Sequence, residues 1–268
     1  MSAVILSFLK RSPVLGWMLK RRFEQLFLSA QNMNLFYGVY SSHEEASDAL
    51  PRSKPLGYDN EASAMLYEER AQRLHYTDYP PLFWLQKLLS CPENRLTESV
   101  RIFDYGGHIG VSYYSYSNII KFPAVAHWVV YDVPAVVEQG RKYAAERGDS
   151  RIEFVTTIEK LNYYDVFFAS GSPQYSPDFF ADLNFECMPR FVLLNMVPCT
   201  NDDEIYTLNN IGTAFCVYHI FNKREFEKKF MNAGYSIVAH WHNEGKICDL
   251  SYSTRSEAAY YGWFLKKN

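Results

Sequence analysis

The sequence predicts an α/β protein in which a mainly parallel sheet with an antiparallel closing strand follows an N-terminal helical region. From residue 100 onward, short apolar runs rich in β-branched and aromatic residues alternate with helical stretches, as in repeated strand–helix units. A glycine-rich loop at 106–110 separates the first run from the first of these helices. By contrast, residues 1–97 carry no strong strand signal.

The N-terminal region, 1–97, is predicted to be helical or irregular. Alanine and leucine recur at helical spacing over 61–75 without Gly or Pro, which predicts a helix there. A second short helix is predicted over 81–89, after a turn at 76–80.

The second region, 98–268, is predicted to contain the whole sheet. Five strands follow one another with helices between them, and a long polar connection then leads to a last helix and two closing strands. The predicted strands are 100–104, 127–132, 152–155, 164–170, 190–195, 236–241 and 260–265, and the helices are 112–120, 135–147 and 223–232.

Charge and cysteine content narrow the classes of function. The 27 Lys and Arg against 30 Asp and Glu give a net charge of −3, which offers no general attraction to a polyphosphate, so we expect no nucleic-acid partner. The five cysteines are odd in number and never form the close pairs of a zinc site, which predicts reduced thiols, a cytoplasmic setting and no metal. They are Cys91, Cys187, Cys199, Cys216 and Cys248.

An apolar run at the N-terminus, 3–9, is followed by basic residues. The run is far shorter than the ~20 residues that span a bilayer, and no signal-peptide cleavage site follows it. Two alternatives remain: a helix lying on an anionic membrane surface, at the inner face of the membrane, and a helix packed on the protein's own body. The basic residues are Lys10, Arg11, Lys20, Arg21 and Arg22.

The loop Asp104-Tyr105-Gly106-Gly107-His108-Ile109-Gly110 lies between a predicted strand and a predicted helix, where glycines permit a sharp turn and close approach of a ligand. Asp132 ends the next strand, 22 residues beyond Gly110, and an acid about 20 positions after such a loop suits a ribose hydroxyl. Together they predict a nucleoside site. The alternative is structural: the glycines only turn the chain, and Asp132 only caps the next helix.

The loop lacks the Gly-x-Gly-x-x-Gly spacing of dinucleotide sites, which disfavours a nicotinamide-dependent oxidoreductase. It resembles motif I of class I S-adenosylmethionine (SAM) dependent methyltransferases, acid-x-Gly-x-Gly-x-Gly. Asp104, Gly106 and Gly110 match, His108 replaces the middle glycine, and Gly107 is an added one. This resemblance implies a Rossmann-like methyltransferase sheet and SAM as the cofactor.

Other segments extend the resemblance. Tyr131-Asp132-Val133-Pro134 is similar to the Asp-Leu-Pro segment of small-molecule O-methyltransferases, and Tyr164-Asp165-Val166 resembles their fourth-strand motif. Phe36-Tyr37-Gly38-Val39-Tyr40 and Gly57-Tyr58-Asp59 are similar to a family of bacterial methyltransferases associated with surface-polysaccharide biosynthesis. The resemblance implies methylation of a hydroxylated small molecule or glycan sugar, with region 1–97 as a lid or acceptor side.

Ten residues are expected to bind the cofactor: Asp104, Tyr105, Gly106, Gly107, His108, Gly110, Tyr131, Asp132, Val133 and Ser170. Ser170 begins the turn after the fourth strand, where it and Tyr175 either border the pocket or only end the strand. Methyl transfer to a hydroxyl needs a base, and His219, in the connection after the fifth strand, is the first candidate. His219 could equally be a buried structural histidine. The rival hypothesis is a non-catalytic partner with the same fold in a biosynthetic complex, because His108 departs from the motif and no base stands out.

Overall fold

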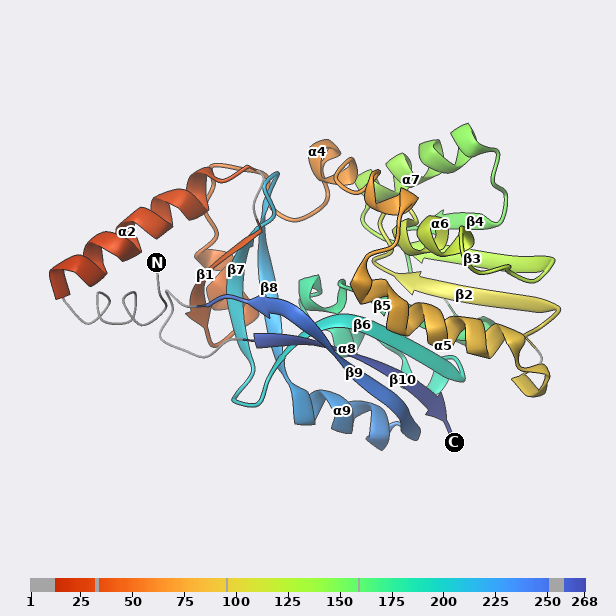
Figure 1. Cartoon of the computed structure of the whole chain (residues 1–268). Helices are drawn as coiled ribbons and strands as arrows, with labels where there is room; N and C mark the ends of the chain where they lie inside the picture. The colour runs from red at the N-terminus through yellow and green to blue at the C-terminus, as the bar shows by residue number, and fades with distance from the viewer. Residues whose placement is uncertain (1–12, 32–33, 95, 159, 251–257) are drawn as a thin grey trace.

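The computed structural model describes residues 13–31, 34–94, 96–158, 160–250 and 258–268. Its main sheet runs in the order β4-β3-β2-β5-β6 and continues into β10 and then β9 (Figure 1). The strands β2 to β6 are mutually parallel, whereas β10 is antiparallel to both of its neighbours. These strands are β2 Ser99–Tyr105, β3 Val125–Tyr131, β4 Ile152–Val155, β5 Val166–Ser170, β6 Phe191–Thr200, β9 Tyr235–Cys248 and β10 Ala258–Lys267. The predicted fold class, a mainly parallel sheet with an antiparallel closing strand, is confirmed.

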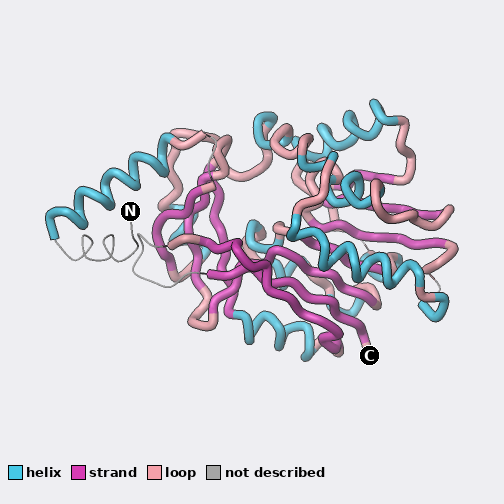
Figure 2. The backbone as a smooth tube through the Cα atoms, in the orientation of Figure 1, coloured by secondary structure: helices cyan, strands magenta, loops and turns pink. Residues whose placement is uncertain are grey.

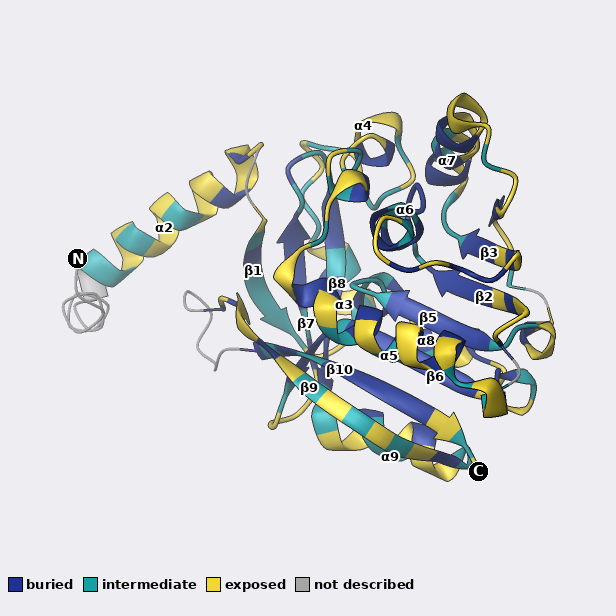
Figure 3. Cartoon of the chain, turned by 45° about the vertical axis from the view of Figure 1, so that its right-hand side comes forward, coloured by how far each residue is buried: buried dark blue, intermediate teal, exposed yellow. Residues whose placement is uncertain are grey.

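Helices cover both faces of this sheet. Because side chains alternate along a strand, Ile102 and Trp128 join one core with residues of α5, α6 and α7. Their neighbours Phe103 and Val129 join the other core, with residues of α8 and α9. Figure 3 shows β2, β3 and β5 coloured mainly as buried. The helices are α5 Tyr79–Ser90, α6 Val111–Ser117, α7 Pro134–Arg147, α8 Phe179–Asp182 and α9 Lys223–Asn232.

Three further strands form an antiparallel extension that the sequence did not predict. β1, Leu35–Tyr40, pairs with β7, Ile205–Asn210, which pairs with β8, Phe215–Asn222. Two residue pairs, Cys199 with Phe221 and Thr200 with Asn222, join β8 to β6. The expectation that 1–97 contains no strand is therefore wrong, and so is the expectation that a polar connection follows the fifth strand.

Between α3, His43–Asp48, and α5 the chain is mostly loop with short helical turns (Figure 2). The predicted helix over 61–75 is wrong in extent, because only α4, Glu61–Ala64, and a 3₁₀ turn, Arg70–Gln72, form there. Asn60 caps α4 by accepting a hydrogen bond from Ser63 N at 2.9 Å. The division of the chain at 97/98 stays a prediction.

The first described helix, α2, Pro13–Ser29, extends away from the sheets (Figure 1). Its last turn is anchored by Phe27, which is buried against Tyr37 and Phe215. Lys20, Arg21 and Arg22 are exposed. No helix in the described part of the chain is both long and apolar enough to cross a membrane. The apolar run 3–9, with Lys10 and Arg11, lies outside the described residues.

Candidate cofactor site and adjoining aromatic wall

The glycine loop after β2 alternates between ordinary and left-handed backbone conformations. Gly106, His108 and Gly110 have φ angles of 66°, 56° and 85°. These are the three positions that the methyltransferase motif assigns to glycine. His108 keeps the left-handed conformation, at a cost of roughly 1–2 kcal/mol for a residue with a Cβ. The backbone geometry of the motif is thus present although the middle glycine is not.

Two of the glycines also leave no room for a side chain. An added Cβ would lie 2.4 Å from Ser172 Cβ at Gly106, and 2.3 Å from Asp104 Oδ2 at Gly107. Gly107, which the motif comparison treats as an addition, is therefore required by the buried carboxyl group beneath it. The loop forms a bare main-chain cradle above Asp104.

Asp132, at the end of β3, holds this loop in place. Its Oδ2 accepts the His108 backbone N–H at 2.9 Å, and its Oδ1 accepts the Val133 N–H at 2.8 Å. Burial raises the pKa of Asp132 to about 6, the two backbone hydrogen bonds oppose that rise, and the charge of Asp59 adds to it. The structure therefore brings the two predicted parts of the nucleoside site into direct contact.

Asp104, within β2, has an unusual environment for a carboxyl group. It is 1% exposed; Oδ2 accepts the Trp128 indole N–H at 2.9 Å, and Oδ1 has no hydrogen-bond partner in the described structure. Burial raises the pKa of Asp104 to about 7. A buried carboxyl oxygen without a partner costs free energy, which a cationic or hydrogen-bonding ligand would recover.

The N-terminal region covers the loop through residues that the sequence analysis did not assign to the site. Ser63 O lies 3.0 Å from His108 Nε2, and the Tyr67 ring lies edge-on to the imidazole at 4.8 Å. The Tyr58 ring also lies edge-on to this imidazole, with 6.3 Å between the ring centroids. Asp59 Oδ1 accepts the Ala135 N–H in the first turn of α7 at 2.8 Å. The one sequence signal for this contact was the Gly57-Tyr58-Asp59 resemblance.

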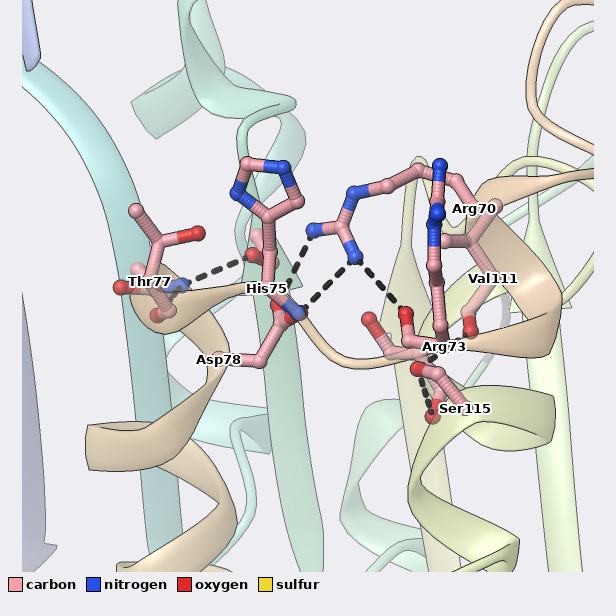
Figure 4. A network of polar contacts seen from close by, with 10 residues as sticks. Arg70, Arg73, His75, Thr77, Asp78, Val111 and Ser115 are labelled. Carbon is pink, nitrogen blue, oxygen red and sulfur yellow. Dashed lines mark hydrogen bonds and ion pairs between the residues drawn. The ribbon is translucent and has the colours of Figure 1, made fainter.

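A charged pair lies beside α6 in the same region (Figure 4). The Arg70 guanidinium binds Asp78 through two nitrogens, at 2.8 and 3.2 Å, and Asp78 also accepts the His75 backbone N–H at 2.7 Å. Burial raises the pKa of Tyr116, in α6, well above its usual value, and the charges of Asp78 and Asp104 contribute. The charges of Asp104 and of this pair thus all affect the pKa of the same α6 side chain, Tyr116.

Three of the predicted binding residues have side chains committed elsewhere. Tyr105 and Tyr131 pack in the core that faces α8 and α9, where the Tyr105 hydroxyl donates to Asp182 Oδ2 at 2.6 Å. Ser170 Oγ accepts from the Asn195 amide at 3.1 Å. These three residues can offer the site mainly their backbone, whereas Val133 is the N-cap of α7 beside Asp132.

His219 lies in β8 and not in a loop. Its ring is stacked between Tyr206 and Phe221, at centroid distances of 4.2 and 3.9 Å, with Glu204 Oε2 3.6 Å from Nε2. Consecutive strand residues point to opposite faces, so His219 lies on the face away from Tyr218. Tyr218 is the residue that contacts Tyr175 and so leads toward the loop. Among the described residues, no contact brings His219 to the glycine loop.

A cavity lies next to one residue of the loop, because Asp182, which accepts the Tyr105 hydroxyl, is part of its lining. A cavity of about 440 Å³ is bordered by the segment after β4 and by Asp182, Asn184 and Cys187. Within the described ranges, no group of three or more His, Cys, Asp or Glu is arranged to hold a metal ion.

No family model matches the sequence, and no curated protein matches it. Solved structures resemble it in the arrangement of elements. They include the magnesium protoporphyrin IX methyltransferase from Synechocystis PCC 6803 with bound SAM, with a TM-score of 0.49, 12% identity, and 76% of this chain and 93% of that chain covered. A SAM-dependent methyltransferase from Clostridium acetobutylicum has a TM-score of 0.48, 10% identity and coverages of 75% and 95%. The 1,6-didemethyltoxoflavin-N1-methyltransferase from Burkholderia thailandensis, with bound 1,6-didemethyltoxoflavin and S-adenosylhomocysteine, has a TM-score of 0.48 and 12% identity, with 72% of this chain and 79% of that chain covered.

Proposed function

We propose that this protein is a SAM-dependent methyltransferase. The observation that carries the proposal is the contact between Asp132 and the backbone of His108, because it joins a ribose-binding acid to a loop whose three motif positions all have left-handed φ angles. The alternative is a purely structural turn. The unpartnered oxygen of buried Asp104 favours a ligand instead.

The residues present fit SAM. Asp132 would accept hydrogen bonds from the ribose hydroxyls, since each of its oxygens has a lone pair left after its backbone contact. Asp104 Oδ1 would accept from the ammonium group of the methionine part. The cradle of Gly106 and Gly107 would let the ligand approach the main chain. When bound, SAM supplies a methyl group on a sulfonium, and the protein's task is to align it with an acceptor and remove a proton.

For the acceptor we propose a hydroxylated small molecule or a sugar of a bacterial glycan. The segments 36–40 and 57–59, which carry the resemblance to methyltransferases of surface-polysaccharide biosynthesis, support it. The second of these segments lies against the cofactor loop, where Tyr58 contacts His108. A cytoplasmic enzyme acting near the membrane fits this proposal.

The rival function is a non-catalytic partner in a biosynthetic complex, and His108 at a glycine position is the observation that favours it. Calorimetry with S-adenosylhomocysteine, SAM and NAD distinguishes the proposals. A methyltransferase binds the first two in the micromolar range and NAD far more weakly. Absence of SAM and S-adenosylhomocysteine binding at millimolar concentration would exclude the proposed function. Radiolabel transfer from methyl-labelled SAM into a glycan would exclude the non-catalytic partner.

We also propose that α2 contacts an anionic membrane surface. Trp17, Met18 and Leu28 are exposed on a helix that also exposes Lys20, Arg21 and Arg22. Co-sedimentation with phosphatidylglycerol vesicles, but not with phosphatidylcholine vesicles, is the expected result. Loss of this binding when the three basic residues are changed to Gln would assign it to α2, and equal binding to both lipids would contradict the proposal.

A further inference from the structure

Four aromatic side chains form a connected group at the carboxyl ends of β2 and β5, and we call it the aromatic wall. It consists of His108, Tyr58, Tyr67 and Tyr175. Tyr58 lies edge-on to Tyr175 at 5.1 Å and contacts His108 at 6.3 Å, so it bridges the loops that follow two adjacent parallel strands. Ligands of open α/β sheets lie in the crevice at this edge.

The tyrosines of the wall are partly accessible although their hydroxyl groups are poorly hydrated. Tyr58, Tyr67 and Tyr175 each keep intermediate exposure. Desolvation nevertheless raises the pKa of all three phenols, that of Tyr58 and of Tyr175 to well above the usual value. The hydroxyls of Tyr58 and Tyr67 lie 3.2 Å apart, and that of Tyr175 donates to Asn209 Oδ1 at 3.0 Å. The three tyrosines are therefore half-buried side chains with largely desolvated hydroxyl groups.

The imidazole of His108 is set in one tautomer. Nε2 lies 3.0 Å from Ser63 O, and a carbonyl oxygen can only accept, so Nε2 carries the hydrogen. The ring is 6% exposed, and burial lowers the pKa of His108 to about 4, so the ring is neutral at pH 7. Nδ1 therefore presents a lone pair, and it has no hydrogen-bond partner among the described residues.

We propose that Nδ1 of His108 accepts the proton of the methyl-acceptor hydroxyl, and that Tyr58, Tyr67 and Tyr175 position the ring that bears this hydroxyl. The inference rests on the proposed methyltransferase function. His108 belongs to the same loop as the glycine cradle, and its backbone N–H is bound to Asp132, so its side chain extends from the cofactor cradle to the wall. A base in this position explains why a left-handed backbone position holds histidine and not glycine.

The reaction balances in atoms and charge. The acceptor oxygen forms a bond to the methyl carbon while the carbon–sulfur bond breaks, and the electron pair of that bond stays on sulfur. The hydroxyl proton moves to His108 Nδ1. One positive charge disappears from the sulfonium as one appears on the imidazolium, so the net charge of the site is unchanged. The proton passes to solvent after the product leaves.

The same wall defines the class of acceptor. The charge of Arg70 lowers the pKa of the Tyr67 phenol, but Arg70 is already paired with Asp78. The negative charge of Asp132 also reaches Tyr67 and raises that pKa. An acceptor carrying phosphate or carboxylate at the wall would meet no unpaired cation among the residues that these contacts bring together. The expected acceptor group is an uncharged ring hydroxyl, which sugars and phenols share.

The first test determines where the Nδ1 atom of His108 lies relative to the bound cofactor product, and it needs no methyl acceptor. Calorimetry with S-adenosylhomocysteine comes first, and failure to bind would overturn the proposed function and not only this inference. In a crystal structure of the complex, Nδ1 is expected on the sulfur side of the loop without a hydrogen bond to the ligand. A hydrogen bond from Nδ1 to the methionine part of the ligand, or an Nδ1 turned away from the sulfur, would overturn the role as base.

The second test uses His108→Gly and His108→Asn, with exposed His127→Asn on β3 as the matched control. His108→Gly restores the glycine of the motif, so S-adenosylhomocysteine affinity is expected within about threefold of the unmodified protein. Methyl transfer is expected to fall at least about 100-fold in both variants, the usual contribution of a general base. Full turnover by His108→Gly would refute the inference, and equal loss of binding and turnover would make His108 a cofactor-binding residue.

The third test identifies the acceptor class with methyl-labelled SAM and three probes: methyl glycosides of hexoses, catechol, and a nucleotide-activated hexose. Label in the glycosides alone indicates a sugar acceptor, and label in catechol alone indicates a phenol. Preference for the nucleotide sugar over the matching glycoside would contradict the uncharged acceptor. If no probe is labelled while S-adenosylhomocysteine binds, the position of Nδ1 in the complex decides the inference.

Discussion

The backbone N–H of His108 donates to Asp132 Oδ2 across 2.9 Å. This bond connects the loop after β2 to the end of β3, two strands that lie side by side in register from Ser99 and Val125 to Tyr105 and Tyr131. The acid therefore holds the loop in its left-handed form, and under the proposed function it has a second task, because its remaining lone pairs would accept from a ribose.

Replacing Asp132 is expected to separate these tasks. Asp132→Ala removes the acceptor of two backbone N–H groups and of the ribose hydroxyls, which should weaken S-adenosylhomocysteine binding by ~1.5–3 kcal/mol for each lost charge-assisted bond. Asp132→Asn keeps one acceptor oxygen and should retain more stability than Ala. Calorimetry and thermal unfolding measure the two effects. Unchanged affinity in both variants would leave Asp132 a purely structural residue.

Asp104 is expected to make stability depend on pH in the absence of ligand. Its pKa is about 7 in the folded protein, against an ordinary value of 3.8 for an aspartate, so the folded state binds more protons than the unfolded state between pH 3.8 and 7. The free energy of unfolding should therefore fall as pH rises from about 4 to about 7, by on the order of 3–4 kcal/mol. Asp104→Asn should flatten this slope and be the more stable protein at pH 8. Urea unfolding at pH 5 and pH 8 checks it, and an unaltered slope would locate the effect elsewhere.

The same substitution should harm binding. If Asp104 Oδ1 accepts from the ligand ammonium, affinity for S-adenosylhomocysteine should fall as pH drops through about 7, because the carboxylate is then protonated. Asp104→Asn should bind weakly at every pH and lose this step. A pH series of titrations measures it, with a pH-independent affinity of the unmodified protein as the contrary result.

Gly107→Ala tests the close approach over Asp104. An added Cβ would lie 2.3 Å from the carboxyl oxygen, so the loop or the aspartate must move. We expect at least tenfold weaker S-adenosylhomocysteine binding. The control is Gly148→Ala just after α7, where the φ angle is 62° and an added Cβ would have open space around it. It should lose about 1 kcal/mol of stability with binding intact. Equal binding by both variants would show that the loop tolerates a side chain.

Asp59→Asn tests the electrostatic link between the N-terminal region and the site. Asn keeps an oxygen for the Ala135 N–H but removes the charge that helps to raise the pKa of Asp132. That pKa should then fall below about 6, and the acid-side loss of S-adenosylhomocysteine affinity should move to lower pH. Titrations between pH 4.5 and 7 locate the midpoint, and a midpoint that does not move would mean that Asp59 acts only as a cap.

The parts of the site that were predictable from sequence are local. The glycine loop follows one strand, and Asp132 follows the next strand of the same strand–helix–strand unit. Their separation in sequence therefore predicts that they lie close together in space. Tyr58, Ser63 and Tyr67 reach the loop from over 40 residues away, through contacts that leave no periodic signal. Their role could not be derived from pattern.

The missed strands have a different cause. β7 carries Thr207, Asn209 and Asn210, which are fully buried and hydrogen-bonded to the chain around β1, α2 and the following turn. Buried polar residues break the alternation of apolar and polar positions that identifies a strand, so the segment was interpreted as a polar connection. In β1, Gly38 has a φ of 80° at the register shift and interrupts the same pattern.

The pairing of β1 with β7 determines which part of the chain can fold first during synthesis. Leu35 lies opposite Asn210, so a nascent chain has no partner for β1 until most of the protein has left the ribosome. The strands that carry Asp104 and Asp132 need no such delay, because their partners are neighbours in sequence. Loops closed over such distances form late. The contact between the glycine loop and Asp132 can therefore form during synthesis, while the extension that contains β1 is completed afterwards.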